Sequence, residues 1–337
     1  MNTIGIRSPY LIFLGSETEV TYAKTGAGLV QWRPELCQGQ ISLPAGTVNL
    51  GLPSLTIDEA VDAGIQSLLI GTAAVGGGIP EDWLAMLEQA AAAGLDIVAG
   101  VHTRLNDVDR LKEAAASSGA RLVDVRVPPQ GLPVGTGKKR SGKRVLTVGT
   151  DCAVGKKYTA LAIERDMKAA GLKATFRASG QTGIMIAGSG IPIDAVVADF
   201  LSGAAEQLSP DNESDHWDVI EGQGGIFHPG YASVTMGLLI GSQPDAFVVC
   251  TEAGRTHIEG WQDFELPSIE AVISRVSGIG KQVNPAIRCA GISVNTSKLP
   301  FDEREDYLSA LSQETGLPCI DPIAGNTMPI IERLLEG

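Results

Sequence analysis

The chain has 337 residues, of which 44% are hydrophobic and 19% are charged, a balance typical of folded proteins and not of disordered ones. Its 26 Lys and Arg against 39 Asp and Glu give a formal net charge of -13, so the average field repels nucleic acids and anionic membranes. A small anionic ligand remains possible, because a local group of amides and lysines overrides a diffuse field that salt screens over about 10 Å.

The five cysteines are widely spaced and never form a C-x-x-C pair, so the sequence indicates neither a disulfide framework nor a zinc knuckle. The apolar run near the N-terminus is too short for a signal peptide or a membrane span. We therefore expect a cytoplasmic protein with no membrane partner. A symmetric homo-oligomer is the default expectation for such a protein.

The length predicts two domains, and residues 136–143, rich in Gly and Lys, are the expected linker between domains 1–135 and 144–337. Before the linker, short apolar strands alternate with helices, with strands expected at 67–71, 96–100 and 121–126 and helices near 57–64, 80–93 and 107–118. After it, strands are expected at 144–149, 173–178, 217–221, 245–250, 287–294 and 317–321. This alternation predicts two α/β domains, a Rossmann-like domain followed by a P-loop domain with a parallel sheet.

The segment VLTVGTDCAVGKKYTA, residues 145–160, predicts a strand, a phosphate-binding loop and the start of a helix. Glycines let backbone N–H groups converge on phosphate oxygens, the helix N-terminus adds about half a positive charge, and Lys156 supplies a point charge. The residues expected to bind a cofactor here are Gly149, Thr150, Asp151, Cys152, Ala153, Val154, Gly155, Lys156, Lys157 and Tyr158.

Several acids and histidines follow predicted strands at the edge where ligands of α/β sheets bind. Glu221 precedes the glycine-rich run GQGG, which lets the backbone approach a ligand. Glu221, His228 and His257 are alternative general bases, and Asp199 is a further catalytic candidate. His102 has a similar location in the first domain. No two histidines share the spacing of metal ligands, so we expect no metal.

The segment RASGQTGIMIAGSGIP, residues 177–192, is too rich in Gly, Ser and Thr for a core helix and follows a predicted strand. It is either a polar connection or part of a binding site. Arg177 and Arg255 are the expected clamps for substrate carboxylates, because a guanidinium pairs with a carboxylate through two hydrogen bonds. The complete set of expected substrate-binding residues is Arg177, Ser179, Gln181, Thr182, Gln223 and Arg255. The glycine-rich turn at 71–80 lacks the spacing of a dinucleotide-binding motif.

Two of these segments resemble dethiobiotin synthetase. GTDCAVGKK is similar to its GTDTxVGKT loop, and IEGQGGIFHP is similar to its EGAGG segment. The resemblance implies that Asp151 and Glu221 coordinate magnesium and that Asn295, in GISVNTSKL, contacts a nucleotide base. Lys157 departs from the pattern, because the relatives carry a Ser or Thr whose hydroxyl binds the metal. A second ammonium removes that ligand and adds a repelling charge, which disfavours ordinary Mg-nucleotide hydrolysis.

Over both domains the chain resembles the D-glutamate N-acetyltransferase (DgcN) family, through GTDCAVGKKYTAL, FRASGQTGIMIAGSGIPIDAVVADF, IEGQGGIFHPGY and GISVNTSKL. The resemblance implies acetyl transfer from acetyl-CoA, as cosubstrate, to the amino group of D-glutamate, a step in D-amino acid catabolism. Two lysines and an amide nest suit the phosphates of coenzyme A without a metal.

Three alternatives remain open on the sequence. One is an ATP- and magnesium-dependent ligase or kinase of the dethiobiotin synthetase type, and another is a non-enzymatic nucleotide sensor. The third concerns mechanism, because Cys152 at a helix N-terminus allows a covalent acetyl relay. No base for its thiol is evident in the neighbouring sequence, so direct transfer is favoured.

Overall fold

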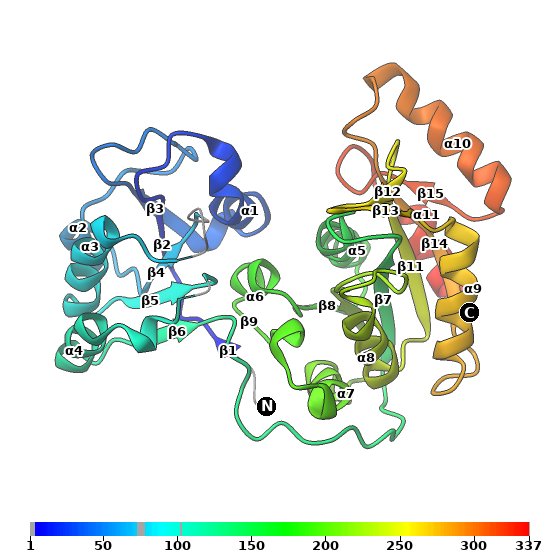
Figure 1. Ribbon diagram of the computed structural model, residues 1–337, viewed down its shortest axis with the longest axis horizontal. Coiled ribbons are helices and arrows are strands. Elements are labelled where there is room, and N and C mark those ends of the chain that lie inside the picture. Colours follow the sequence, from blue (N-terminus) through cyan, green and yellow to red (C-terminus); the bar gives the residue numbers. More distant parts are fainter. Residues whose placement is uncertain (1–3, 73–77, 102, 337) are drawn as a thin grey trace. The chain divides into compact units, whose positions relative to one another are not determined.

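The computed structural model describes residues 4–72, 78–101 and 103–336. They form two compact units (Figure 1). The P-loop unit contains residues 130–180 and 196–337, and the Rossmann-like unit contains the described part of residues 4–129 together with 181–195. Our sequence-based division assigns 181–195 to the second domain. His102 and part of the glycine-rich turn at 71–80 lie outside the described residues.

The Rossmann-like unit is built on a five-stranded parallel sheet with the order β3-β2-β4-β5-β6. Its strands are β2 (Tyr10–Phe13), β3 (Cys37–Ile41), β4 (Ser67–Ile70), β5 (Asp96–Ala99) and β6 (Leu122–Asp124), and β1 (Ile4–Gly5) pairs separately with β9 (Ser189–Gly190). Its helices are α1 (Lys24–Trp32), α2 (Ile57–Asp62), α3 (Glu81–Ala92), α4 (Asp109–Ser118) and α6 (Gln181–Ala187).

The strands β2 and β4 are buried at every position, and alternate residues of each contribute to one core cluster. Leu11 and Phe13 of β2 and Leu68 of β4 pack with apolar residues of α2, α3 and α4. Trp83 of α3 meets the ring of Phe13 edge-on, with ring centroids 5.1 Å apart. The predicted strands and helices between 57 and 126 are present, whereas α1, β2 and β3 were not predicted.

The segment 177–192 contradicts one expectation. It contains the helix α6, whose residues Gly183, Ile184, Met185 and Ile186 are buried, although its composition argued against a core helix. Glycine at position 183 lowers helix propensity, but burial of the adjoining apolar side chains decides the outcome. Helix α6 contacts α1 within the Rossmann-like unit.

The P-loop unit contains a six-stranded parallel sheet with the order β15-β14-β11-β7-β10-β8. Its strands are β7 (Lys143–Gly149), β8 (Ala174–Arg177), β10 (Trp217–Ile220), β11 (Ala246–Glu252), β14 (Arg288–Asn295) and β15 (Cys319–Ile320). Strands β7, β10 and β11 are almost continuously buried, as a sheet covered on both faces requires. All six were predicted within about three residues of their bounds.

Helices α5 (Lys156–Ala169) and α11 (Met328–Leu335) contact each other and the sheet, as do α8 (Ala232–Ser242) and α9 (Ile269–Gly280). Helix α7 (Ala198–Leu208) packs on α8, and α10 (Arg304–Thr315) contacts β15. A short hairpin, β12 (His257–Ile258) and β13 (Trp261–Glu265), follows β11. No helix among the described residues is long and apolar enough to cross a bilayer.

The linker runs as an ordered strap over α7 and α8. The N–H groups of Thr136 and Gly137 donate to the Glu206 carboxylate at 2.8 Å, and Arg140 donates to the carbonyl groups of residues 241 and 242. A Cβ atom at Gly203 of α7 would lie 1.9 Å from the Pro133 carbonyl oxygen. The close approach of strap and helix therefore requires glycine at position 203.

We expect Gly203→Ala to lower the free energy of unfolding by at least about 1–3 kcal/mol, because the strap backbone must shift. Gly278→Ala in α9 is the matched control, since a Cβ atom there meets no atom within 4 Å. It should raise stability by about 0.5–1 kcal/mol through helix propensity. Urea denaturation of both variants measures the difference. Equal effects of the two substitutions would show that the strap is not closely packed.

Candidate active site at the phosphate loop

The phosphate loop, residues 150–155, joins β7 to α5 at the carboxyl edge of the sheet. Strand β7 lies between β10 and β11, and the chain passes from β10 to the far side of β7 to form β11. The strand order reverses at this point, and ligands of open α/β sheets bind in the crevice beside such a reversal. Glu221 follows β10 and Arg255 follows β11, so both lie at this edge.

The loop presents a row of unused hydrogen-bond donors. The backbone N–H groups of Ala153, Val154, Gly155, Lys156 and Lys157 donate to no acceptor in the described part of the chain. Positive φ angles of 54° at Ala153 and 102° at Gly155 turn the backbone into this conformation. Successive N–H groups at a helix N-terminus form a nest for anions. We call these five residues the amide nest.

Two lysines stand at the amide nest. The buried Lys156 donates from Nζ to the Asp151 carbonyl oxygen at 2.7 Å, and burial lowers the pKa of its ammonium. Lys157 is half-buried, and its Nζ lies 4.6 Å from the centre of the Tyr158 ring. Burial also lowers the pKa of Lys157, while the charge of Glu221 raises it. An anion in the nest would restore the favourable surroundings that both ammonium groups lose by burial.

Glu221 is a buried carboxyl group with one oxygen held in place. It is 3% exposed, and its Oε2 accepts the N–H groups of Ser179 at 2.9 Å and Gly180 at 3.0 Å. The Ser179 hydroxyl donates to the Glu221 carbonyl and accepts from Gln223 Nε2. Burial raises the pKa of Glu221 to about 7, against the opposing effects of Lys157, the two amides and Lys156.

Asp151 is wholly buried and bound on both oxygens. Its Oδ2 accepts from Arg255 Nη1 and from the Glu259 N–H, each at 2.8 Å, and its Oδ1 accepts from the Cys152 N–H at 2.6 Å. Arg255 also pairs with Glu252 and Glu259. The expected clamp at Arg255 is therefore already occupied by carboxylates of the protein. Glu252 was not predicted, although its spacing of three residues from Arg255 in TEAGR could have indicated the pair.

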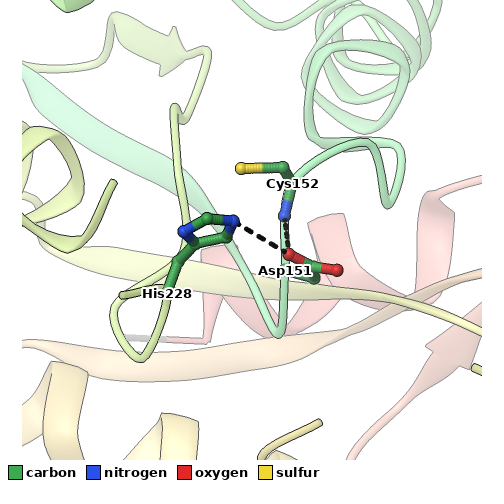
Figure 2. A group of neighbouring side chains, drawn as sticks. All are labelled: Asp151, Cys152 and His228. Carbon is green, nitrogen blue, oxygen red and sulfur yellow. Dashed lines mark hydrogen bonds and ion pairs between the residues drawn. The ribbon is translucent and has the colours of Figure 1, made fainter. Parts of the chain in front are cut away.

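His228, Asp151 and Cys152 lie together at the loop, and one donor atom from each lies within 4.8 Å of the others (Figure 2). His228 is 1% exposed, and its Nε2 lies 3.8 Å from Asp151 Oδ1. Its Nδ1 accepts the Gly230 N–H at 3.0 Å, so the ring proton resides on Nε2. Burial lowers the pKa of His228, which keeps the ring neutral.

This trio has the residue types of a metal centre but not the protonation that a metal needs. A metal-bound histidine usually donates from its other nitrogen, whereas Nδ1 of His228 accepts a hydrogen bond. Asp151 is already neutralised by Arg255. The cluster is therefore better suited to hydrogen bonding than to metal binding. A protonated Nε2 is also unable to take the proton of Cys152, and burial raises the pKa of that thiol.

Two other predicted binding residues are engaged within the protein. Arg177 donates from Nε and Nη2 to Asp218 Oδ1, each at 2.8 Å, so it is not an open carboxylate clamp. Asn295 Oδ1 accepts the Ser297 N–H, and its Nδ2 lies 3.4 Å from Glu252 Oε2. A base contact by Asn295 would have to displace these bonds. Asp218 gave no signal in the sequence, because only strand pairing brings it beside β8.

The remaining predicted residues lie on other elements and form none of the contacts described above. Asp199 is exposed in the first turn of α7, where a carboxylate complements the helix dipole. Gln181 and Thr182 begin α6 in the Rossmann-like unit, whereas Ser179 belongs to the P-loop unit. His257 is exposed after β11, and its Nδ1 lies 2.9 Å from the Thr256 hydroxyl.

Comparison with known proteins agrees with the predicted fold. A family model described as "Domain of unknown function (DUF1611_C) P-loop domain" matches residues 133–331, and a companion described as "DUF1611_N" Rossmann-like domain matches 45–128. A crystal structure of a DUF1611 family protein from Anabaena variabilis has a TM-score of 0.84 and 31% identity, covering 98% of this chain and 100% of that one. The chain is a two-domain P-loop protein, and it belongs to the DUF1611 family.

Two relatives carry a functional name. A protein of Tritonibacter scottomollicae named D-glutamate N-acetyltransferase is 46% identical, and one of the same name from a Pseudoalteromonas species is 44% identical. Each match covers 98% of this chain and 99% of the relative. The family resemblance predicted from the sequence motifs is confirmed.

The pKa of Glu221 predicts a pH-dependent stability. Below pH 4.5 the carboxyl group is protonated in both the folded and the unfolded chain, whereas between pH 4.5 and about 7 only the folded chain keeps the proton. Stability contributed by this group is therefore lost as the pH rises through about 7, by roughly 3 kcal/mol in all. Glu221→Gln retains the amide contacts and removes this titration.

Urea denaturation of wild type and Glu221→Gln from pH 5 to pH 8 measures the difference. We expect the stability of the variant relative to wild type to increase by about 2–3 kcal/mol over this range. Gly278→Ala, which changes no ionisable group, is the control and should give no comparable trend. A constant difference between wild type and Glu221→Gln would contradict the raised pKa.

Proposed function

We propose that this protein is an acetyltransferase that moves the acetyl group of acetyl-CoA to the amino group of D-glutamate. The names of two relatives that match almost the whole chain support the reaction. The observation that carries the donor assignment is the amide nest, with five unused N–H groups beside two desolvated lysines. Coenzyme A carries a diphosphate and a ribose phosphate, which are the kind of anion that such a nest binds.

Binding of the phosphates at the nest constrains where the reaction takes place. In coenzyme A the pantetheine arm separates the diphosphate from the thioester by many bonds. A base that deprotonates the attacking amine must lie within hydrogen-bond reach of it, so it must also lie away from the phosphates. The charges of Lys157 and Lys156, both at the nest, lower the pKa of Glu221, so Glu221 fits the phosphate end better than the thioester end. His228 is buried, with both ring nitrogens directed at protein groups.

His257 is the base that satisfies this constraint. It lines an open pocket of about 430 Å³ at the carboxyl end of β11, and its Nδ1 contacts the Thr256 hydroxyl, while Nε2 has no hydrogen bond to a described residue. Glu265, in the same pocket, would pair with the ammonium group of D-glutamate. The hydroxyl groups of Thr256 and Ser268 would donate to the carboxylates of D-glutamate. Arg255 lines the pocket and also contacts the phosphate loop, which connects the two parts of the site.

The reaction then proceeds by direct transfer. The amine nitrogen attacks the thioester carbonyl carbon, His257 takes the amine proton, and collapse of the tetrahedral intermediate expels the thiolate of coenzyme A. A relay through Cys152 would need a thiolate, and both the raised pKa of this thiol and the proton on His228 Nε2 oppose its formation.

The cellular setting follows from the donor. Acetyl-CoA is an intracellular metabolite and the described cysteines are all free thiols, so we place the enzyme in the cytoplasm. The net charge of -13 disfavours nucleic acid as a partner, and we expect a symmetric homo-oligomer.

The test of the proposed function is release of the coenzyme A thiol from acetyl-CoA on addition of D-glutamate. We expect turnover in the presence of excess chelator, with N-acetyl-D-glutamate identified by mass spectrometry. Phosphate or ADP release that depends on D-glutamate, ATP and magnesium would instead indicate a ligase or kinase. Tight nucleotide binding without turnover of any amine would indicate a sensor.

Substitution of His257 tests the assignment of the base. We expect His257→Asn to lower kcat by about 100-fold or more, with the KM for acetyl-CoA changed less than about twofold, because only proton transfer is lost. Glu221→Gln is the comparison, and it should alter the KM for acetyl-CoA more than kcat. Loss of kcat in Glu221→Gln with full activity in His257→Asn would reassign the base to Glu221.

A further inference from the structure

Resemblance to dethiobiotin synthetase implies a magnesium ion held by Asp151, Glu221 and the residue that follows the loop lysine. That residue is Lys157, which has no oxygen ligand to offer. Magnesium requires oxygen ligands with available lone pairs in near-octahedral geometry. The surroundings of the two carboxylates decide whether the remaining residues suit it.

Asp151 does not fit a magnesium ion. Its Oδ2 already accepts a guanidinium N–H of Arg255 and the backbone N–H of Glu259, and its Oδ1 accepts the N–H of Cys152. His228 directs its protonated Nε2 at the same Oδ1 from 3.8 Å. A dication placed there would lie beside the fixed charge of Arg255. It would also have to displace donors that satisfy a wholly buried carboxylate.

Glu221 has a cation of its own as well. Two backbone N–H groups hold its Oε2, and the charge of Lys157 lowers the pKa of Glu221 more than the charge of Lys156 does. The Lys157 ammonium has no hydrogen-bond acceptor and no carboxylate oxygen within 4.0 Å among the described residues. Burial lowers the pKa of this ammonium, and a phosphate oxygen at the adjoining nest would offer it a charge-assisted hydrogen bond.

We propose that Lys157 and Arg255 together replace the divalent metal of related phosphate loops and make this nest selective for metal-free phosphate ligands. Arg255 neutralises Asp151, and Lys157 balances Glu221 and binds the ligand. The ammonium group of Lys157 and the guanidinium group of Arg255 thus take the place of one divalent cation. Lys157 is then the specificity-determining residue of the loop. The proposal rests on the proposed function only in that the nest binds phosphate groups.

Isothermal titration of the full-length protein with coenzyme A and with ADP, each in excess EDTA and in free magnesium, tests this selectivity. We expect the Kd for coenzyme A to differ less than about twofold between the two conditions. If magnesium contributed a contact to the ligand, its removal by EDTA would raise the Kd about tenfold. A loss of more than tenfold in EDTA would overturn the proposal. Failure of both probes to bind in either condition would overturn it too.

Two variants at position 157 separate charge from metal binding. Lys157→Thr restores a hydroxyl ligand but leaves Arg255 on Asp151, so we expect binding about tenfold or more weaker in EDTA and no more than about twofold recovery in magnesium. Lys157→Met lacks both features and should stay weak in both conditions. Circular dichroism and urea denaturation check that each variant is folded. Wild-type affinity of both variants in EDTA would remove the role assigned to Lys157.

These outcomes are distinct from the test of acetyl transfer. If ADP binds equally well with and without magnesium but coenzyme A does not bind, the metal-free nest stands and the assigned donor is wrong. If acetyl transfer occurs but requires magnesium for donor binding, the reaction stands and the role of the two resident cations is wrong.

Discussion

The ion pair between Asp151 and Arg255 joins the phosphate loop to the segment that follows β11. Asp151 is wholly buried, so without its guanidinium partner it would be an uncompensated charge, which typically costs several kcal/mol. The same carboxylate accepts the Glu259 N–H at the tip of the β12–β13 hairpin. One side chain therefore fixes the loop, the hairpin and one wall of the pocket that contains His257.

Local charge, and not the net charge of -13, governs this edge of the sheet. Burial removes Lys156 and Lys157 from water beside the amide nest. Arg177 forms an ion pair with Asp218, and Arg255 forms ion pairs with Asp151 and Glu252. The positive charge that stays available for a ligand is thus concentrated on two consecutive residues at the start of α5. Such an arrangement favours a compact polyanion over a single carboxylate.

The predictions succeeded where the signal was local and were incomplete where distant residues decide the outcome. Strand β7, the loop and α5 follow from consecutive residues, because apolar runs, glycines and helix formers act within a few positions. The helix α6 was missed because its composition is unfavourable and tertiary burial of Ile184 and Ile186 outweighs it. The partner of Arg177 was equally hidden, since Asp218 lies on another strand.

The sequence by itself determined the two α/β domains, the phosphate loop and the unusual lysine at position 157. Each of these depends on neighbouring residues, whose spacing directly sets backbone conformation and helix geometry. Only the tertiary structure decided which charged groups are free and which are paired. Ion pairs such as Asp151 with Arg255 join residues about a hundred positions apart, and burial shifts the pKa of Glu221 through surroundings contributed by several elements.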